Sequence, residues 1–576
     1  MSIPLLKINN LTVGFSLASG TTSAVRNISF EINRCETVAI VGESGSGKTV
    51  TSLSILRLLP SPPAIYKDGN ILFSDDGISA IDLLRLNNDE LRKVRGNKIA
   101  MIFQEPMTSL NPVKTCGEQV MEAMKIHQPL SQKEARIKAM KLFEQVKLPD
   151  PSSVLDSYPH EISGGQKQRV MIAMAVSCHP ALLIADEPTT ALDVTVQKNI
   201  LQLIKELQVK EQMSVIYITH DLGLVTEIAD KVIVMYKGEI VEAGSVKEIF
   251  LNPQHPYTRA LLRCRPTASS RGKRLPVISD FLNGIPETKD QNREHREKIN
   301  LKSNSLSQNL QSDNPLLKVE NLSVYFPVKK NFFGKVLKEF KAVDDVSFTV
   351  NKGETVGLVG ESGCGKTTLG RSLIRLIPPT SGTILFNGKN IANIPEDRFR
   401  KMRKDIQIIF QDPYGSLNPR LTIGQAINEP MKIHSILPGE KLRKEKIIDL
   451  LEKVDLKPEY FNRYPHEFSG GQRQRICIAR ALSLNPDFII CDESVSALDV
   501  SVQAQVLNLL NDLKEELGFT CIFISHDLGV VHYISDRIMV MNKGKIEETG
   551  TADEIYFHPQ KEYTQRLIAS IPKLEF

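Results

Sequence analysis

The sequence predicts an α/β protein in which two similar units follow one another, each built on a mostly parallel sheet. Three observations predict this class. Long strings of residues recur between the two halves, short β-branched runs alternate with helical segments, and a glycine-rich loop directly follows one such run in each half. Short apolar, β-branched runs are typical of the buried strands of parallel sheets. Sheets of this kind bind ligands at the carboxyl ends of their strands.

The internal repeat sets the number of units. GESGSGKT at 42–49 recurs as GESGCGKT at 360–367, and YPHEISGGQKQR at 158–169 recurs as YPHEFSGGQRQR at 464–475. Length alone, at 576 residues, favours three or four domains. The repeat reduces this number to two units of roughly 260 residues each.

A polar stretch separates the two units. Its later part, KDQNREHREKINLKSNSLSQNLQSD, has few apolar residues, which is typical of a linker. We therefore expect a first unit at 1–265, a polar linker at 266–314 and a second unit at 315–576.

Composition and charge narrow the class of protein. The chain has 72 basic and 67 acidic residues, and a net charge of +5 at this size does not indicate nucleic acid as a partner. We find no run of 18 apolar residues, and MSIPLLKINN lacks the order of a secretory signal, so we expect the chain to stay in the cytosol. The eight cysteines form no CxxC pair and are expected to be reduced, mostly core thiols.

A phosphate-binding loop is predicted in each unit. The pattern GxxxxGK[ST] follows the runs TVAIV and TVGLV, and glycines at this place let backbone N–H groups close around phosphate oxygens while the next helix begins. A glycine-rich turn before a helix is the simpler interpretation, but it does not explain two matches in repeat register. The predicted residues are Gly42, Glu43, Ser44, Gly45, Ser46, Gly47, Lys48 and Thr49, and Gly360, Glu361, Ser362, Gly363, Cys364, Gly365, Lys366, Thr367 and Thr368.

A carboxylate pair ends a later apolar run in each unit. ALLIADE ends in Asp186 and Glu187, and FIICDE ends in Asp492 and Glu493. Alone, such a pair is more often a solvated strand end. Downstream of a phosphate loop, the first acid is expected near Mg²⁺ with Thr49 or Thr367, and the second is expected to polarise an attacking water.

Four further motifs resemble one family. SGGQ at 163–166 and 469–472 resembles the signature loop of ATP-binding cassette proteins. The other motifs follow in the family's order: Gln104 and Gln411, the carboxylate pairs, ALD at 191–193 and 497–499, and His220 and His526. The resemblance covers nearly the whole chain outside the predicted linker.

The resemblance implies the fold in more detail and the ligand. It implies two tandem P-loop NTPase nucleotide-binding domains, each with a mostly parallel sheet core, an antiparallel β subdomain and a helical subdomain. It also implies that each signature loop grips the γ-phosphate of ATP held by the opposite cassette, with the serine hydroxyl, the N–H groups and the helix dipole acting together. These residues are Ser163, Gly164, Gly165 and Gln166, and Ser469, Gly470, Gly471 and Gln472.

The resemblance also assigns roles to single residues. Glu187 and Glu493 become general bases, His220 and His526 contact the γ-phosphate, and Gln104 and Gln411 sense water and Mg²⁺. The implied Mg²⁺ set is Thr49, Gln104 and Asp186 in one unit and Thr367, Gln411 and Asp492 in the other. Phe15 and Phe326, at matching positions in NLTVGF and NLSVYF, either stack on adenine or belong to the core, and the sequence leaves both open.

The C-terminal tail of each unit points to a subfamily. FLNPQHPYTRALL at 250–262 is similar to the HPYT segment of ATPases that serve dipeptide, oligopeptide and nickel importers. The second tail keeps Tyr563 and Thr564 but has Lys561 and Glu562 where the first has His and Pro. Ser494 stands where the family usually has Pro, yet both units keep all the catalytic residue types, so two competent sites are predicted.

These resemblances imply an ATPase that couples closure of two composite ATP sites to uptake of peptides or a related small solute. The implied partners are two integral-membrane permease subunits and, through them, an external solute-binding protein, with the chain peripheral on the cytoplasmic face of a bacterial inner membrane. The alternatives are a tandem-cassette translation factor on ribosomes, which lacks the HPYT tail, and a DNA-repair cassette protein, which needs zinc-binding cysteine pairs. The sequence does not identify the solute.

Overall fold

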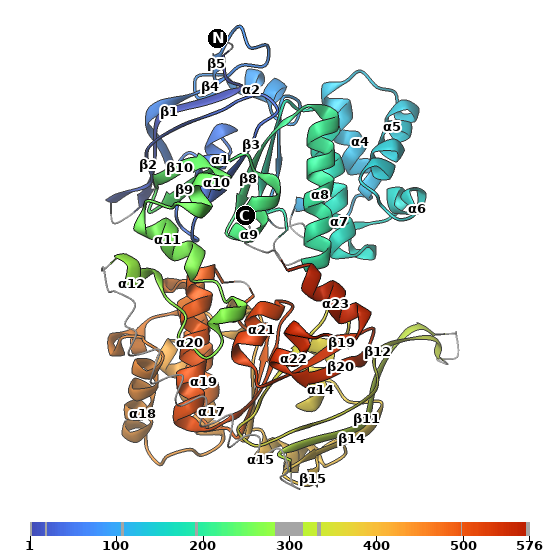
Figure 1. The fold of residues 1–576 in the computed structure, drawn as a ribbon, viewed down its shortest axis with the longest axis vertical. Coiled ribbons are helices and arrows are strands. Elements are labelled where there is room, and N and C mark those ends of the chain that lie inside the picture. Colours follow the sequence, from blue (N-terminus) through green and yellow to red (C-terminus); the bar gives the residue numbers. More distant parts are fainter. Residues whose placement is uncertain are drawn as a thin grey trace. The chain divides into compact units, whose positions relative to one another are not determined.

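The computed structural model describes residues 3–17, 20–104, 109–189, 194–282, 315–330, 336–496 and 498–571. The chain divides into two compact units, the first up to Arg263 and the second from Cys264 to Ile571 (Figure 1). The two units share one topology.

The first unit contains two sheets. A six-stranded sheet has the order β10-β9-β3-β8-β7-β6, in which only β10 is antiparallel to its neighbour. A four-stranded antiparallel sheet has the order β2-β1-β4-β5. The strands are β1 (Leu6–Leu17), β2 (Gly20–Ile32), β3 (Thr37–Val41), β4 (Ala64–Phe73), β5 (Ile81–Asp82), β6 (Ile99–Ile102), β7 (Leu182–Asp186), β8 (Ser214–Thr219), β9 (Lys231–Tyr236) and β10 (Glu239–Ser245).

The helices of the first unit cover the parallel sheet, and α4 to α7 pack together beside α8 (Figure 1). Several start with a capping box, such as α4 at Thr115 and α5 at Ser131, which satisfies the free N–H groups of the first turn. The helices are α1 (Lys48–Ile55), α2 (Asn88–Val94), α4 (Cys116–His127), α5 (Gln132–Gln145), α6 (Pro151–Asp156), η1 (Pro159–Glu161), α7 (Gly164–Val176), α8 (Val194–Glu211), α9 (Leu222–Ile228), α10 (Val246–Leu251) and α11 (Pro256–Arg263).

The second unit repeats both sheets, with the orders β16-β17-β18-β13-β19-β20 and β12-β11-β14-β15. Its strands are β11 (Leu317–Lys330), β12 (Val336–Val350), β13 (Thr355–Val359), β14 (Ser381–Phe386), β15 (Lys389–Asn390), β16 (Ile406–Ile409), β17 (Phe488–Asp492), β18 (Thr520–Ile524), β19 (Arg537–Asn542) and β20 (Lys545–Thr551). Its helices are η2 (Ala268–Ser270), α12 (Ile278–Leu282), α14 (Lys366–Leu373), α15 (Glu396–Met402), α16 (Pro413–Ser416), α17 (Ile423–Ile433), α18 (Glu440–Lys453), η3 (Pro458–Asn462), η4 (Pro465–Glu467), α19 (Gly470–Leu482), α20 (Val500–Leu517), α21 (Leu528–Ile534), α22 (Ala552–Phe557) and α23 (Glu562–Ala569).

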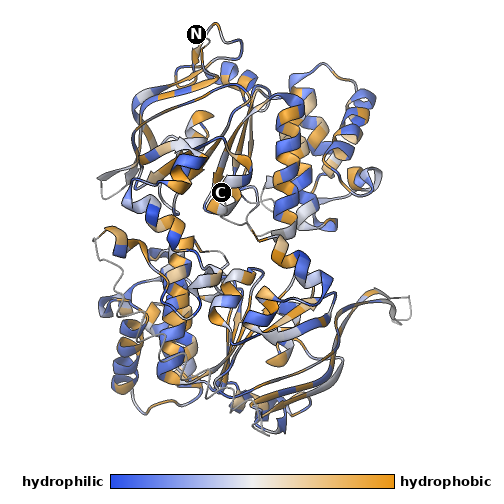
Figure 2. Cartoon of the chain, viewed as in Figure 1, coloured by the Kyte–Doolittle hydropathy of each residue, from blue (hydrophilic) through white to orange (hydrophobic). Residues whose placement is uncertain are grey.

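The parallel sheet of the first unit lies between two apolar cores. One core joins the sheet to the antiparallel sheet and α1, through residues such as Leu6, Ile40 and Ile55. The other joins it to α4, α5, α7 and α8, through residues such as Phe143 and Ile200. Every residue of β3, β7 and β8 is buried, so both faces of these strands are covered, as the β-branched runs predicted. Apolar residues, orange in Figure 2, occur in the strands and helices of both units. The predicted fold class is confirmed.

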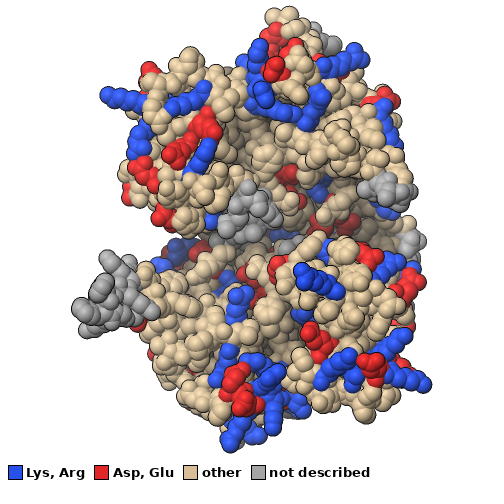
Figure 3. Space-filling view, turned by 180° about the vertical axis from the view of Figure 1, so that it is seen from behind, with Lys and Arg blue, Asp and Glu red and all other residues tan. Residues whose placement is uncertain are grey.

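Charged side chains of both signs lie on the surface. On the face seen in Figure 3, basic and acidic side chains are interspersed over both units. Within the described ranges, no helix combines the length and the apolar content needed to cross a bilayer.

The predicted domain boundaries differ in one place from the two compact units of the structure. Residues 264–282, almost all of which were assigned to the linker, include η2 and α12 and are grouped with the second unit. Residues 283–314, the ALD motif at 191–193 and the first residue of the ALD motif at 497–499 lie outside the described residues. The domain boundaries stay a prediction.

A histidine of the second unit is buried beside an acid. His532 in α21 is 1% exposed, with Nε2 2.8 Å from Oδ1 of Asp553 and its ring against Tyr556 and Phe557. Burial, and to a smaller extent the nearby Arg271, lowers the pKa of His532 below 6.5, against the opposing effect of Asp553. The unfolded chain therefore binds more protons as pH falls below 6.5, and folded stability present above that pH is lost.

We predict that the free energy of unfolding of the second unit decreases between pH 6.5 and 5, and that His532→Gln flattens part of this decrease. Glutamine keeps a hydrogen-bond donor toward Asp553 but does not titrate. Urea unfolding at a series of pH values measures the difference between the two proteins. If the free energy of unfolding falls equally with pH in wild type and variant, His532 contributes nothing to the pH dependence.

Candidate functional site

Each predicted phosphate loop connects a buried strand to a helix. The first joins β3 to α1, and α1 begins at Lys48 directly after Gly47, whose φ of 102° is left-handed. Nζ of Lys48 donates to the carbonyls of Gly42 (2.7 Å) and Glu43 (2.8 Å). The loop thus holds its own ammonium group at the helix N-terminus, where the helix dipole also favours an anion.

The second loop has the same geometry. It joins β13 to α14, and Nζ of Lys366 donates to the carbonyls of Gly360 (2.7 Å) and Glu361 (2.9 Å). One difference is Cys364, which stands where the first loop has Ser46, and burial raises the pKa of its thiol. Each lysine is buried, so an outer phosphate in the loop would meet a poorly solvated positive charge.

A buried aspartate faces each loop. Asp186 ends β7 and lies 3.4 Å from Oγ1 of Thr49, while Asp492 ends β17 and accepts a hydrogen bond from Oγ1 of Thr367 (3.0 Å). Burial, and secondarily the charge of Glu187, raises the pKa of Asp186 to about 6, and burial likewise raises the pKa of Asp492. A hydroxyl beside a carboxylate is a hard oxygen pair that fits Mg²⁺, and a cation there would stabilise the ionised acid.

The second aspartate has a basic neighbour. Nε of Arg371 in α14 lies 3.5 Å from Oδ2 of Asp492. By the repeat, the corresponding residue of the first unit is Leu53. The two sites therefore differ in charge beside the same carboxylate, a feature the sequence motifs do not contain.

The sheet order brings the three other predicted residues together. In the first unit Asp186 is in register with Ile218 of β8, and Ile102 of β6 is in register with Ala185 of β7. Because parallel strands end at the same edge, the residues just after β6, β7 and β8 must meet there. These residues are Gln104, Glu187 and His220.

The contacts among them are direct. Nε2 of Gln104 donates to Oε2 of Glu187 (3.0 Å), and Nδ1 of His220 lies 3.2 Å from Oε1 of Glu187. In the second unit, Gln411 donates to Glu493 (2.9 Å), and His526 lies 3.6 Å from it. Each glutamate is therefore held between an amide and an imidazole.

Both glutamates also have strained backbones. The φ of Glu187 is 46° and that of Glu493 is 49°, in the left-handed region that side chains rarely adopt. Each keeps its N–H bonded to the next strand, to Ile218 or Ile524 (3.0 Å in both). Strain retained at the same position of both units is typical of a functional residue whose direction is fixed by its surroundings.

Electrostatics favour a charged pair in the second unit. Burial alone would raise the pKa of Glu493, but the neighbouring His526 and, less strongly, Lys366 hold it below its ordinary value. Burial alone would lower the pKa of His526, yet Glu493 raises it. A carboxylate that stays ionised suits a general base, and a protonated imidazole suits a developing phosphate charge.

The signature serines open helices, as predicted. Ser163 and Gln166 form a capping box at the start of α7, and Ser469 and Gln472 do so at α19. The hydrogen bonds described for the two serines stay within their own helices. Ser163 and Ser469 are exposed, so their hydroxyls and helix N-termini are available to a ligand.

The two candidate adenine residues lie in different surroundings. Phe15, in β1, is partly buried and packs against the core of the first unit, whereas Phe326, in β11, is 39% exposed. Their adenine contact stays a prediction in both units.

A tyrosine from each C-terminal tail binds the phosphate loop, which sequence reasoning missed. The hydroxyl of Tyr257 in α11 accepts a hydrogen bond from the N–H of Glu43 (2.9 Å), and that of Tyr563 in α23 accepts one from Glu361 (3.1 Å). Tyr257 is fully buried, with its ring 4.2 Å from that of Tyr236. The available signal was the tyrosine that both tails keep, Tyr257 and Tyr563, although the two residues before it differ.

We predict that Tyr257→Phe weakens ATP binding to the first loop about tenfold, because the N–H of Glu43 loses its acceptor in a buried place. Titration with a fluorescent ATP analogue measures this loss. Tyr236→Phe is the matched control, since it keeps both rings and the hydrogen bond at Glu43. Unchanged affinity in Tyr257→Phe would mean that the tail does not position the loop.

A phosphate loop with a buried aspartate and a glutamate held between Gln and His, present twice, defines a tandem ATP-binding cassette ATPase. The chain belongs to the ABC transporter family, whose model matches residues 25–190 and 343–496. A second model, the oligopeptide/dipeptide transporter C-terminal region, matches residues 241–298. The chain is thus an ATP-hydrolysing subunit of a transporter of this family.

Several known proteins are similar to it. The glutathione import ATP-binding protein GsiA of Escherichia coli (strain K12) is 50% identical over 99% of this chain and 90% of its own length. GsiA of Shigella sonnei (strain Ss046) is 49% identical over the same shares. Among solved structures, MJ0796, a bacterial ABC transporter cassette, is 28% identical, with a TM-score of 0.38 over 41% of this chain and 98% of its own.

Proposed function

We propose that this ATPase drives the import of glutathione or a related short peptide through two membrane permease subunits, to which an external binding protein delivers the solute. The contact of a glutamate with a glutamine and a histidine beside a phosphate loop, present in both units, is the observation that best supports ATP hydrolysis. The solute and its direction of transport follow from the similarity to glutathione import proteins and from the match to the oligopeptide/dipeptide C-terminal region.

The residues support the following hydrolysis step. Lys48 and Lys366 bind the outer phosphates, and Glu187 and Glu493 accept a proton from the attacking water. Gln104 and Gln411 orient that water, while His220 and His526 stabilise charge on the γ-phosphate. Mg²⁺, held at Thr49 and Asp186 or at Thr367 and Asp492, would neutralise charge on the phosphate oxygens.

The signature loops complete each site in this proposal. Ser163 to Gln166 would close on the ATP bound at Lys366, and Ser469 to Gln472 on the ATP bound at Lys48. Closure needs both nucleotides, which ties hydrolysis to a movement that permeases can use. The same proposal places the chain on the cytoplasmic face of a bacterial inner membrane, peripheral to its permeases.

The competing function is that of a translation factor acting on ribosomes. Its two ATP sites would be built alike, so the sites do not distinguish the two functions. The HPYT tail of the first unit does, because it lies in the match to the oligopeptide/dipeptide transporter C-terminal region.

Purification of the tagged chain from its native membrane, followed by mass spectrometry, tests the proposal. We expect two polytopic membrane proteins in near-equal amounts, and a binding protein when solute is present. A tagged chain that brings down ribosomal proteins and no polytopic protein would contradict the importer assignment while leaving the ATPase sites intact.

A further inference from the structure

The segment directly after the first tail helix is docked on the second unit. Residues 264–282 follow α11, and their buried members are Cys264, Pro266, Leu275 and Ile278. The segment lies against α20 and α21: η2 contacts α21, and the Pro266 carbonyl oxygen comes within 3.6 Å of where a Cβ on Gly529 would stand. Because only these four residues of the segment are buried, polar contacts are needed to offset the conformational entropy lost when it is ordered.

A buried asparagine supplies the central contact. Asn508 of α20 is 3% exposed, its Oδ1 accepts from the N–H of Leu275 (3.0 Å), and its Nδ2 donates to the carbonyl of the same residue (2.8 Å). One side-chain amide thus satisfies both backbone groups of a buried residue, as a neighbouring strand would. The hydroxyl of Tyr533 in α21 lies 3.0 Å from the Lys273 carbonyl and 3.1 Å from Asn508 Oδ1, which fixes the amide.

Two arginines fasten the segment on either side of this contact. Arg274 makes two contacts with Asp512 of α20, at 2.7 and 3.0 Å. Arg271 donates to the carbonyl of Ser535 (3.1 Å) and pairs with Asp553 of α22 (2.6 Å). Burial alone would raise the pKa of Asp553, but Arg271 and His532 hold it below its ordinary value, so it stays charged.

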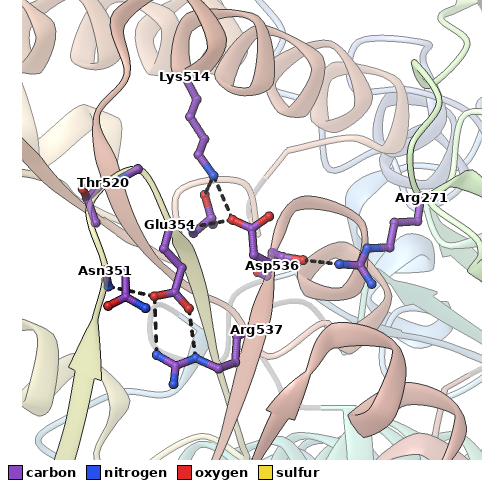
Figure 4. Close-up of polar contacts among 10 residues, drawn as sticks. Arg271, Asn351, Glu354, Lys514, Thr520, Asp536 and Arg537 are labelled. Atoms are coloured by element: carbon purple, nitrogen blue, oxygen red, sulfur yellow. Dashed lines mark hydrogen bonds and ion pairs between the residues drawn. The ribbon is translucent and has the colours of Figure 1, made fainter. Parts of the chain in front are cut away.

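The surface that receives Arg271 is rigidly framed (Figure 4). Asp536, next to Ser535, accepts from the N–H of Thr355 (2.8 Å) and from Lys514 (3.0 Å). Arg537 pairs with the buried Glu354 (2.9 Å). Because these bonds tie the end of α21 to the sheet, the Ser535 carbonyl is held in position for the arginine.

The first unit does not carry this receiving surface. With the repeat offset of 306, the residues at the positions of Asn508, Tyr533 and Asp553 are Gln202, Glu227 and Lys247. Lys247 would repel an arginine where Asp553 binds one, and Glu227 has no hydroxyl to fix an amide. Two acids are kept: Asp512 corresponds to Glu206, and the frame residue Asp536 corresponds to Asp230, which likewise accepts from the N–H of Thr37 (2.8 Å).

We propose that residues 264–282 form a clasp, whose receptor is the α20–α21–α22 surface of the second unit, and that this clasp holds the C-terminal tail of the first unit to the second. Because α11 and the clasp are continuous in the chain, the tail that binds the first phosphate loop through Tyr257 ends in a segment bound by the other cassette. The clasp, rather than residues 283–314, then keeps the cassettes together between rounds of ATP closure, at a high effective concentration.

Cutting the full-length protein after the clasp tests this proposal. A protease recognition sequence inserted between residues 295 and 296 is cleaved, and the two fragments are run on size-exclusion chromatography in EDTA without nucleotide. We expect the wild-type fragments to elute together. Asn508→Leu combined with Arg271→Ala should separate them, with dissociation at least tenfold faster, because buried backbone groups of the clasp lose their partners.

Two controls keep the test decisive if the double variant folds poorly. Gln202→Leu, the repeat position in the first unit, should leave the fragments together. Arg274→Glu acts at an exposed pair and should speed dissociation several-fold, and adding Asp512→Arg should restore the wild-type rate. Wild-type fragments that separate, clasp variants that stay together, or a charge swap without restoration would each overturn the proposal.

Discussion

Replacement of both Glu187 and Glu493 by glutamine is expected to reduce ATP hydrolysis about 10²- to 10⁴-fold while leaving ATP binding intact. Each glutamate contacts a glutamine amide and a histidine ring. Glutamine keeps the size and part of this hydrogen bonding but cannot accept a proton from water. The variant should therefore hold ATP in both loops without cleaving it.

Phosphate release and equilibrium binding of a fluorescent ATP analogue measure the two effects separately. Glu206→Gln, at an exposed acid paired with Lys147, is the control carboxylate and should leave both unchanged. The single variants should each lower the rate, since both units carry the same contacts. A double variant that hydrolyses ATP within tenfold of wild type would show that these acids are not the general bases.

Gly365→Ala is expected to abolish ATP binding at the second loop. Gly365 has a φ of 110°, and a Cβ there would lie 2.1 Å from the backbone carbonyl oxygen of Ala342, which cannot move without displacing β12. The left-handed conformation alone costs an alanine roughly 1–2 kcal/mol. The added collision forces the loop open just before Lys366, so we expect at least a hundredfold loss of affinity.

Gly363→Ala is the matched control. Gly363 also has a left-handed φ, of 79°, but a Cβ there meets nothing within 4 Å. Its substitution should cost only the free energy of placing an alanine in the left-handed conformation, which corresponds to about a tenfold loss of ATP affinity. Isothermal titration with a non-hydrolysable ATP analogue compares the two variants. Equal losses would mean that backbone strain, and not the contact with Ala342, determines the loop.

The sequence predicted the sheet and the position of the site well, because both depend on short-range patterns. Five-residue β-branched runs became fully buried strands, and the phosphate loop followed β3 and β13 as expected. Glu187 was predicted from its place after an apolar run downstream of the phosphate loop. Gln104 and His220 lie far from it in the chain and were recognised only by resemblance. The order β8-β7-β6 supplies the physical reason that they meet.

Two contacts of the structure could not be predicted from the sequence: the contact of each tail with a phosphate loop, and the docking of residues 266–282. Tyr257 lies in a recognised tail motif, but nothing in the motif says which backbone group its hydroxyl reaches. Residues 266–282 were predicted as linker because they are polar, and the contacts that dock them run from side chains to backbone groups. Such contacts leave no periodic pattern, and only the comparison of repeat positions such as Asn508 and Gln202 indicates that the two units differ there.

Uptake of labelled glutathione into membrane vesicles tests whether ATP hydrolysis by this chain drives glutathione import. Right-side-out vesicles are used, so that the chain and ATP are inside. The vesicle membrane contains the permeases that copurify with the chain, and the binding protein is added outside. We predict ATP-dependent accumulation of glutathione that is lost in the Glu187→Gln, Glu493→Gln double variant. Accumulation that persists in the double variant, or hydrolysis by the wild type that drives no uptake of glutathione or any short peptide, would contradict the account.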